Sequence, residues 1–279
     1  MKSRRRESKA VTALLYLFLI MLSVICLFPV QWIVMASLNT GNALYSSSLV
    51  PEQLTLSHYR YLFDHTDYVL WFWNTFKIAC MNMGASLVVV TAAAYAVSRF
   101  RFTGREIVLT TLMVLQMFPS FMAMISVYIL LLQAGLLDTH LGLVLVYVAG
   151  GSPIGIWIVK GYMDGIPKSL EETARIDGAS HTTVFVRVIA PLCVPILSFV
   201  ALTSFIAPWM DFILPRLLLR SSEKKTLAIG LFEMVMDKSQ MQFTTFAAGA
   251  VLLAIPITLL FFFLQRYVID GLTAGASKG

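Results

Sequence analysis

The chain alternates between long stretches of apolar residues and short polar connections. Six apolar stretches are long enough to cross a bilayer, which takes about 20 helical residues. These are residues 11–37, 70–98, 107–133, 141–161, 183–214 and 246–268. Because a helix satisfies its own backbone hydrogen bonds within lipid, the pattern predicts an all-α membrane protein with six transmembrane helices.

Several of these stretches contain helix-perturbing residues, namely Pro119, Pro195, Pro208, Pro256 and the run AGGSPIG at 149–155 around Pro153. Proline removes a backbone donor and bends a helix, and such breaks are tolerated where the helix faces protein or a water-filled cavity. The run therefore predicts a broken helix that lines a pathway. Close helix packing through small residues is the alternative interpretation.

Composition and charge agree with this class and predict an orientation. Hydrophobic residues make up 58% of the chain and charged residues 13%, whereas soluble domains carry about 25% charged residues. Fourteen of the 21 lysines and arginines lie in segments that would be cytoplasmic with both termini inside, six lie outside, and Lys77 falls within the second stretch. The positive-inside bias predicts an N-in, C-in topology and accounts for the net charge of +6 without a nucleic-acid partner.

The basic start MKSRRRESK could also begin a cleaved signal peptide. The apolar stretch after it is too long for that, and no clear small-residue cleavage site follows. An uncleaved first span is therefore the favoured interpretation.

Residues that could carry chemistry are scattered along the chain. The three cysteines and four histidines show no disulfide or metal spacing, and no nucleophile–base arrangement occurs. The phosphate-binding pattern G-x-x-x-x-G-K-[ST] is absent from the sequence. The chain is therefore expected to be no enzyme and to hold no metal or cofactor.

One strongly charged segment lies between two apolar stretches, at residues 168–177. Ser169 followed three residues later by Glu172 fits a capping box that starts a helix. Gly178 fits the left-handed position that ends one, and Ser180 can cap the next helix. The pattern predicts a short cytoplasmic helix, a glycine turn and a second helix entering the fifth span. Its careful capping indicates a docking element rather than a plain connector.

This segment resembles the E-A-A-x-x-x-G loop of ATP-binding-cassette importer permeases, with Glu172, Thr173, Ala174 and Gly178 in the motif positions. The downstream I-x-L-P of that motif falls on residues 188–191. Thr173 and Ala190 depart from the pattern, and both are small. The similarity extends over nearly the whole chain, through runs such as QMFPSFMA and GLTAGASKG, and is greatest to the G-type permease subunit of maltose/maltodextrin importers.

The resemblance implies the transmembrane domain of a type I importer in the bacterial plasma (inner) membrane. Residues 1–69 would hold the N-terminus, first span and extracellular loop. Residues 70–268 would form the core with a coupling loop at 162–182, and 269–279 a cytoplasmic tail. The implied partners are a second, F-type permease subunit, two ATPase subunits that bind ATP and Mg, an extracellular sugar-binding protein, membrane lipid and an oligosaccharide substrate such as maltodextrin.

The resemblance and the pattern together nominate three groups of residues. Contact with the ATPase is expected from the loop residues Glu171, Glu172, Thr173, Ala174, Asp177 and Gly178, and from the tail residues Gly271, Gly275 and Lys278. Gly151 and Pro153 are candidates for lining the pathway. Asn74 and the pair Trp209 and Asp211 combine aromatic and polar groups, so they are candidates for sugar contact, although tryptophans near membrane interfaces are commonly anchors.

Two functional alternatives remain open from the sequence. The chain could transport another sugar or a polyol. It could also be an ion-coupled secondary transporter, since its helices are interrupted and Lys77 lies at membrane depth.

Overall fold

The structure, a computed structural model, describes residues 9–41, 53–236 and 242–276. All the elements named within these residues are helical. In chain order they are α1 (Lys9–Ser37), α2 (Ser57–His65), α3 (Tyr68–Arg99), α4 (Arg105–Gln116), the 3-10 helix η1 (Ser120–Ala123), α5 (Met124–Gln133), α6 (His140–Asp164), α7 (Ser169–Ile176), α8 (His181–Val184), the π-helix η2 (Phe185–Ile189), α9 (Ala190–Leu192), α10 (Val194–Met210), α11 (Ile213–Leu218), the 3-10 helix η3 (Ser222–Lys224), α12 (Leu227–Met236) and α13 (Phe243–Ala276).

Long apolar helices form most of the described chain. Four of them, namely α1, α3, α6 and α13, are long and apolar enough to cross a membrane. Two further predicted spans are bent pairs: α4 meets η1–α5 at 95°, and the helix from α8 to α9 meets α10 at 79°. The prediction of an all-α membrane protein is therefore confirmed, with four spans, or up to six if each bent pair crosses once.

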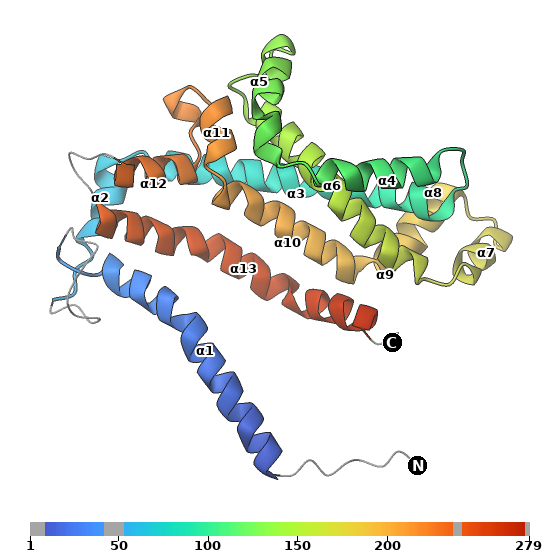
Figure 1. Cartoon of the computed structure of the whole chain (residues 1–279), viewed down its shortest axis with the longest axis horizontal. Helices are drawn as coiled ribbons and strands as arrows, with labels where there is room; N and C mark the ends of the chain where they lie inside the picture. Colours follow the sequence, from blue (N-terminus) through green and yellow to red (C-terminus); the bar gives the residue numbers. More distant parts are fainter. Residues whose placement is uncertain (1–8, 42–52, 237–241, 277–279) are drawn as a thin grey trace. The chain divides into compact units, whose positions relative to one another are not determined.

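The helix breaks lie elsewhere than the small-residue run predicted. The expected break at 149–155 is wrong, because α6 continues through Pro153 without interruption. The chain instead bends at Pro119, between α4 and η1, and at Cys193, between α9 and α10. Figure 1 shows α5 turning away from the direction of α4. Local sequence alone does not distinguish a proline held in a packed helix from one at a bend.

Close packing explains part of the run at 149–155. A Cβ added to Gly155 would lie 3.0 Å from Cγ2 of Val90 on α3. Gly155 therefore allows α6 to approach α3 closely, as small residues do between membrane helices. Gly150 and Gly151, one turn earlier, have open space around the same position. Close helix packing therefore applies to Gly155, whereas Gly150 and Gly151 face open space, as expected of residues that line a pathway.

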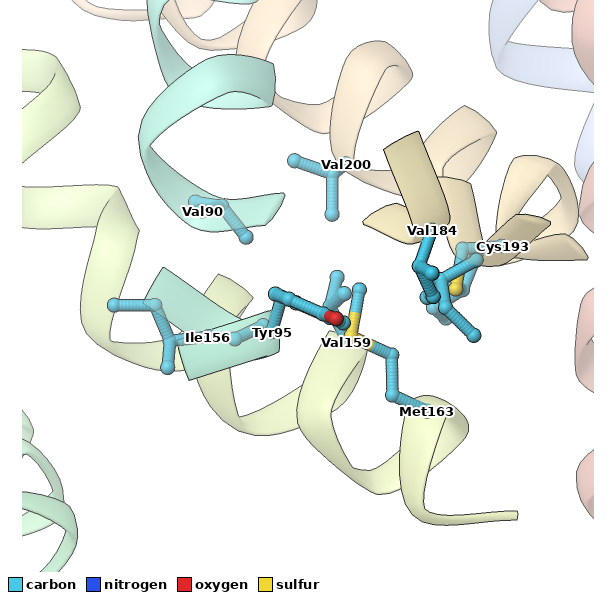
Figure 2. Close-up of a cluster of buried hydrophobic side chains, with 11 residues drawn as sticks. Val90, Tyr95, Ile156, Val159, Met163, Val184, Cys193 and Val200 are labelled. Carbon is cyan, nitrogen blue, oxygen red and sulfur yellow. The ribbon is translucent and has the colours of Figure 1, made fainter. Parts of the chain in front are cut away.

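Contacts divide the chain into two units, one joining residues up to Thr66 with Glu233–Leu252, the other joining Asp67–Phe232 with the chain from Leu253 on. In the second unit α3 packs along both α6 and α10. A buried apolar cluster fills the space where α3, α6 and the helices from α8 to α10 meet (Figure 2). Its labelled members are Val90, Tyr95, Ile156, Val159, Met163, Val184, Cys193 and Val200.

The first unit is held by polar contacts around α2. His58 is buried, its Nε2 lies 2.8 Å from the carbonyl oxygen of Asn39, and its Nδ1 lies 3.2 Å from Oγ1 of Thr245. The hydroxyl groups of Ser37 and Tyr59 lie 2.8 Å apart. These bonds connect the end of α1 and the start of α13 to α2.

The connection after the fifth predicted span contains a helix that the sequence pattern did not predict. Helix α12 begins in the second unit, where Leu227, Ile229 and Leu231 are almost fully buried. Gly230 lies directly against the ring of Trp71 on α3. Its ten residues are too few for a span, so the position of this helix depends on tertiary packing rather than on its length.

Candidate functional site

The charged segment forms the short helix α7, and its C-terminal end has the predicted geometry. Gly178 has φ +86°, and its N–H donates to the carbonyl oxygen of Arg175 at 3.0 Å. The N–H of Ala179 donates to the carbonyl oxygen of Ala174 at 2.9 Å. These two bonds are the Schellman arrangement that ends a helix at a left-handed glycine.

The start of α7 differs from the prediction. Lys168 occupies the N-cap position and no side-chain capping bond is present, so the expected capping box of Ser169 and Glu172 is wrong. Ser169 is already the first helical residue. At the next helix the prediction is confirmed, since Ser180 is the N-cap of α8 and its Oγ accepts a hydrogen bond from the N–H of Thr183 at 3.2 Å.

Most of the nominated loop residues are accessible on α7 and its turn. Glu172, Thr173, Asp177 and Gly178 are exposed, and Ala174 is partly buried against the apolar cluster. Beside them Ile176 is 86% exposed.

Glu171 differs from its neighbours because it is turned into the protein. Its side chain is 6% exposed and forms an ion pair with Arg99, the last residue of α3, whose side chain is 4% exposed. Nη2 of Arg99 also donates to the carbonyl oxygen of Ile166 at 3.1 Å. Glu171 therefore joins α7 to the chain's own α3.

A cavity of about 690 Å³ lies in the second unit, among residues of α3, α6, α10 and the region around the α4–α5 bend. Its polar lining residues are Asn82, Ser86, Gln116, Ser120, Tyr147, Thr203, Ser204 and Asp211. Gly150 and Gly151 form part of its wall. The volume is within the range of about 300–1,000 Å³ typical of small-molecule sites.

Two of the five residues nominated for the pathway or substrate line this cavity, namely Gly151 and Asp211. Asn74 lies elsewhere, and its Nδ2 donates to the carbonyl oxygens of Glu223 and Lys225 at 2.8 and 3.0 Å. Trp209 is 1% exposed and packs its ring against Phe72 and Phe205. Pro153 is buried within α6. For these three residues the described contacts are with the chain itself.

Several cavity residues were missed from the sequence because they lie singly on apolar helices. Asn82 donates from Nδ2 to the carbonyl oxygen of Ser204 at 2.6 Å, which joins α3 to α10. Nε2 of Gln116 donates to the carbonyl oxygen of Gly150 at 2.9 Å. A single amide side chain within an apolar stretch would have indicated these cavity residues, because polar groups at membrane depth face the interior of the helix bundle.

Asp211 is the only charged residue among those described as lining the cavity. Its Oδ2 accepts a hydrogen bond from the hydroxyl of Tyr147 at 3.0 Å. Its Oδ1 accepts from the N–H groups of Ile213 and Leu214 at 2.9 and 3.3 Å. Both carboxylate oxygens are therefore occupied by donors of the chain itself.

The nominated tail residues Gly271 and Gly275 lie in the last turns of α13, which continues past the predicted span end at residue 268 to Ala276. Lys278 lies outside the described residues. In the part of the chain that the structure describes, no group of three or more His, Cys, Asp or Glu side chains could hold a metal ion.

Comparisons with known proteins agree with this architecture. The chain is 44% identical over 267 residues to the galactooligosaccharides transport system permease protein GanQ of Bacillus subtilis, covering 95% of this chain and 94% of that protein. It is 40% identical over 264 residues to the maltodextrin transport system permease protein MdxG of the same organism, covering 95% of each chain. A crystal structure of a bacterial ABC transporter that imports the acidic polysaccharide alginate has the same fold, with a TM-score of 0.79, 23% identity, and coverage of 96% of this chain and 100% of the other.

Residues 87–273 match the family described as binding-protein-dependent transport system inner membrane component. That match covers more than half of the chain and includes α7, its glycine turn and most of the cavity lining. This chain therefore belongs to the family of inner membrane components of binding-protein-dependent transport systems.

Proposed function

We propose that this chain forms one side of the route by which an uncharged oligosaccharide crosses the membrane in an ATP-driven importer. The observation that carries the proposal is the cavity of about 690 Å³ with its polar lining between α3, α6 and α10. Family membership makes the chain a subunit of a transporter in the bacterial inner membrane, with ATP hydrolysis in separate subunits. It speaks against the alternative of an ion-coupled secondary transporter.

The chemistry of the lining favours an uncharged sugar. Amide and hydroxyl groups such as those of Asn82, Gln116 and Thr203 can exchange hydrogen bonds with sugar hydroxyls. Asp211 adds a negative charge, and no lysine or arginine is among the described lining residues to attract an acidic sugar. The relatives named for galactooligosaccharides and maltodextrin support this class, and another sugar or a polyol remains the alternative.

The topology is part of the proposal. Six spans follow if α4–α5 and α8–α10 each cross the membrane once despite their bends. An even number of spans puts both termini on one side, and the excess of Lys and Arg in the connections of that side supports the cytoplasm. Residues 1–69, 70–268 and 269–279 would then be the entry segment, the core with the coupling loop at 162–182, and the cytoplasmic tail.

The partners proposed are two ATPase subunits, an extracellular sugar-binding protein and a second permease subunit. A binding-protein-dependent importer with separate ATPase subunits is what the family supports. The F-type label that the sequence suggested for the second permease is wrong, and the proposal is limited to a second permease subunit. The proposed ATPase contact is the exposed side of α7 and its turn, with Glu172, Thr173, Ala174, Asp177 and Gly178, joined by Gly271, Gly275 and Lys278 of the tail.

Transport by the assembled complex tests the function. The chain is reconstituted in vesicles with its cognate permease, ATPase and binding protein, and uptake of labelled maltodextrin, galactooligosaccharide and a uronic-acid oligosaccharide is measured. ATP-dependent uptake of an uncharged oligosaccharide is expected. Uptake of the acidic oligosaccharide alone, or uptake by this chain alone driven by an ion gradient, would contradict the proposal.

The cavity has its own test. Gly151→Leu should fill part of the cavity without a backbone clash, since a Cβ there meets nothing within 4 Å. Uptake is expected to fall about tenfold, because a single extra methylene group in a binding pocket can already change specificity by about tenfold. Gly84→Leu is the matched control: its Cβ also has open space and Gly84 is not among the lining residues. Equal uptake by the two variants would exclude this cavity from the route.

The coupling surface is tested at two exposed positions. Glu172→Lys reverses a charge on α7, and Gly178→Val forces a β-branched residue into a left-handed backbone. Both variants should insert and assemble but hydrolyse ATP without sugar uptake. Normal uptake by either variant would count against docking through α7.

A further inference from the structure

We infer that the buried ion pair between Arg99 and Glu171 is the connection through which a displacement of α7 reaches the cavity. Arg99 is the last residue of α3, and Glu171 lies in the first turn of α7. The inference rests on the proposed function, because it assumes that α7 is moved by a partner. It assigns Arg99 and Glu171 as positioning residues that touch neither sugar nor ATP.

The contact between the two helices is made by several groups. Nε of Arg99 donates to Oε1 of Glu171, and the hydroxyl of Tyr95 lies 3.5 Å from Oε2. Nη2 of Arg99 donates to the carbonyl oxygen of Ile166 in the connection that leads to α7. The guanidinium therefore holds both the helix and the segment before it. Separating a buried pair leaves an uncompensated charge inside the protein, so α7 and the end of α3 move together.

The ion pair is supported by packing. The apolar cluster in Figure 2 joins Tyr95 of α3, Met163 of α6 and Val184 of α8. The rings of Tyr95 and Phe185 have centroids 4.8 Å apart, and Ala174 of α7 packs against the same cluster. Packed interiors deform little, so this packing keeps α7 and the end of α3 in a fixed relative position.

Three routes lead from α7 to the cavity. One runs back through the connection at 165–168 into α6, which also lines the cavity, and Arg99 holds this connection through the carbonyl oxygen of Ile166. The other two differ in stiffness. The covalent route forward along the chain passes the left-handed turn at Gly178, the π-helix η2 and the 79° bend at Cys193 before it reaches α10. The route through the ion pair enters α3, a single helix of 32 residues without proline. A bent and interrupted route can absorb a displacement, whereas an unbroken helix transmits it.

Helix α3 carries three residues of the cavity wall, namely Asn82, Ser86 and Val90. At 1.5 Å per residue, Asn82 lies about 25 Å along the helix from Arg99. Asn82 also donates a hydrogen bond to the carbonyl oxygen of Ser204 on α10. A shift of α3 along its axis would therefore change the cavity and act on α10 at the same place.

The test is the ratio of sugar transported to ATP hydrolysed, measured on the full complex with its cognate partners at equal amounts of assembled transporter. Glu171→Gln should lower this ratio at least fivefold, because α7 still docks but no longer carries α3 with it. Arg99→Lys keeps the opposite charges together and should retain at least half of the parent ratio. A merely structural role would lower transport and hydrolysis in proportion, and that outcome would overturn the inference.

A charge pair nearby provides the matched control. Lys160 and Asp164 form an ion pair at the C-terminal end of α6, where their side chains are 14% and 41% exposed. Lys160→Gln should leave the ratio at the parent value. An equal loss of coupling in Lys160→Gln and Glu171→Gln would show a general effect of charge at this end, and would overturn the specific role of the buried pair.

A second readout follows α3 directly. Ser86→Cys, in a chain whose Cys26, Cys80 and Cys193 are replaced by serine, places one thiol in the cavity wall. Its reaction with a small thiol reagent should differ at least threefold between the ATP-bound and nucleotide-free complex, and Glu171→Gln should abolish that difference. A difference that survives in Glu171→Gln would overturn the inference. Failure of the proposed function would be recognised separately, since the parent complex would then show no ATP-dependent uptake.

Discussion

Asp138, in the connection between α5 and α6, has a left-handed backbone with φ 57°, unlike the other described non-glycine residues. Aspartate tolerates this region better than most side chains. Its Oδ1 accepts hydrogen bonds from the backbone N–H groups of Arg220 and Ser221 at 2.8 and 3.1 Å. Its Oδ2 accepts from Oγ of Ser221 and from Nζ of Lys224, the latter at 3.2 Å. One carboxylate thus holds the connection between α11 and α12.

The protonation of Asp138 follows from these contacts. Burial alone would raise the pKa of its carboxyl group, but the hydrogen bonds from Ser221, Arg220 and Lys224 outweigh it and lower the pKa below the ordinary value. A lowered pKa in the folded state stabilises the fold above the ordinary aspartate pKa of about 3.9. That stabilisation is lost as the pH falls through the lowered pKa.

We expect Asp138→Asn to reduce the free energy of unfolding by about 1–3 kcal/mol at pH 7, the usual cost of disturbing a charged hydrogen-bond partner. Asparagine keeps the left-handed preference, so the charge is what changes. The measurement is the thermal midpoint of the purified transporter in detergent. Glu223→Gln removes an exposed charge from the same connection and should have little effect.

The pH dependence of the same variant gives a second check. The difference in thermal midpoint between parent and Asp138→Asn should be constant from pH 5 to pH 8. It should shrink below about pH 4, where the carboxyl group of the unfolded parent begins to protonate while that of the folded parent stays charged. A difference that grows on acidification would contradict the charged state assigned to Asp138.

Gly230 on α12 gives a steric prediction. A Cβ at this position would lie 2.1 Å from Cε3 of Trp71 on α3, whose ring is buried. Gly230→Ala should therefore force α12 away from α3 and destabilise the protein by about 1–3 kcal/mol, the usual cost of overpacking. Gly161→Ala, where nothing lies within 4 Å of the added carbon, should leave the thermal midpoint unchanged or slightly raised.

At the scale of elements, α11 depends on one side chain at its start. Oδ1 of Asp211 accepts from the N–H groups of Ile213 and Leu214, which are among the first amides of that helix and have no partner within it. The hydroxyl of Tyr147 connects the same carboxylate to α6. Asp211 therefore has a structural role in addition to its place in the cavity wall.

This arrangement predicts different effects for two variants. Asp211→Ala should increase hydrogen exchange of the amides of Ile213 and Leu214, because their acceptor is removed. Tyr147→Phe should leave those two amides protected, since it removes only the bond to α6. Hydrogen–deuterium exchange with mass spectrometry on the purified complex distinguishes the two, and equal exchange in both would contradict the capping role.

The elements also show how far sequence patterns reach. The apolar stretches located the membrane spans within α1, α3, α6 and α13 closely, because length and hydropathy alone determine that a helix can cross lipid. The same patterns marked Pro119 and Pro195 among several helix-perturbing residues, but they did not show that the bends occur at Pro119 and Cys193 while α6 continues through Pro153. A proline can be accommodated in a packed helix or mark a bend, and the neighbouring helices decide which occurs.

For the whole molecule, the N-in, C-in topology predicts where reporter fusions are active. Alkaline phosphatase, which is active only outside the cytoplasm, should be inactive when fused after Gly104 and active when fused after Ser222. Green fluorescent protein at the C-terminus should fluoresce. A reversed pattern at the two internal positions would contradict the topology and would move α7 away from any cytoplasmic ATPase.

The candidate site was predictable from the sequence only where its signal is local. The Gly178 turn and the Ser180 cap follow from a few neighbouring residues, and both are confirmed. Of the residues nominated for pathway or sugar contact, Gly151 and Asp211 lie in the cavity wall, whereas Trp209 and Asn74 were placed elsewhere by the fold. A polar residue on an apolar helix predicts that its side chain points away from lipid. Which side chain it contacts depends on the neighbouring helix.

By itself the sequence determined the class of the protein, the positions of most membrane helices and the charged loop between two of them, because hydropathy, charge bias and helix capping act over short distances along the chain. Its family followed from resemblance to known permeases. The tertiary structure alone decided that Glu171 faces Arg99, 72 residues away, and that residues of α3, α6 and α10 form one cavity. Such contacts join residues far apart in the chain, and they exist only once the helices have packed against one another.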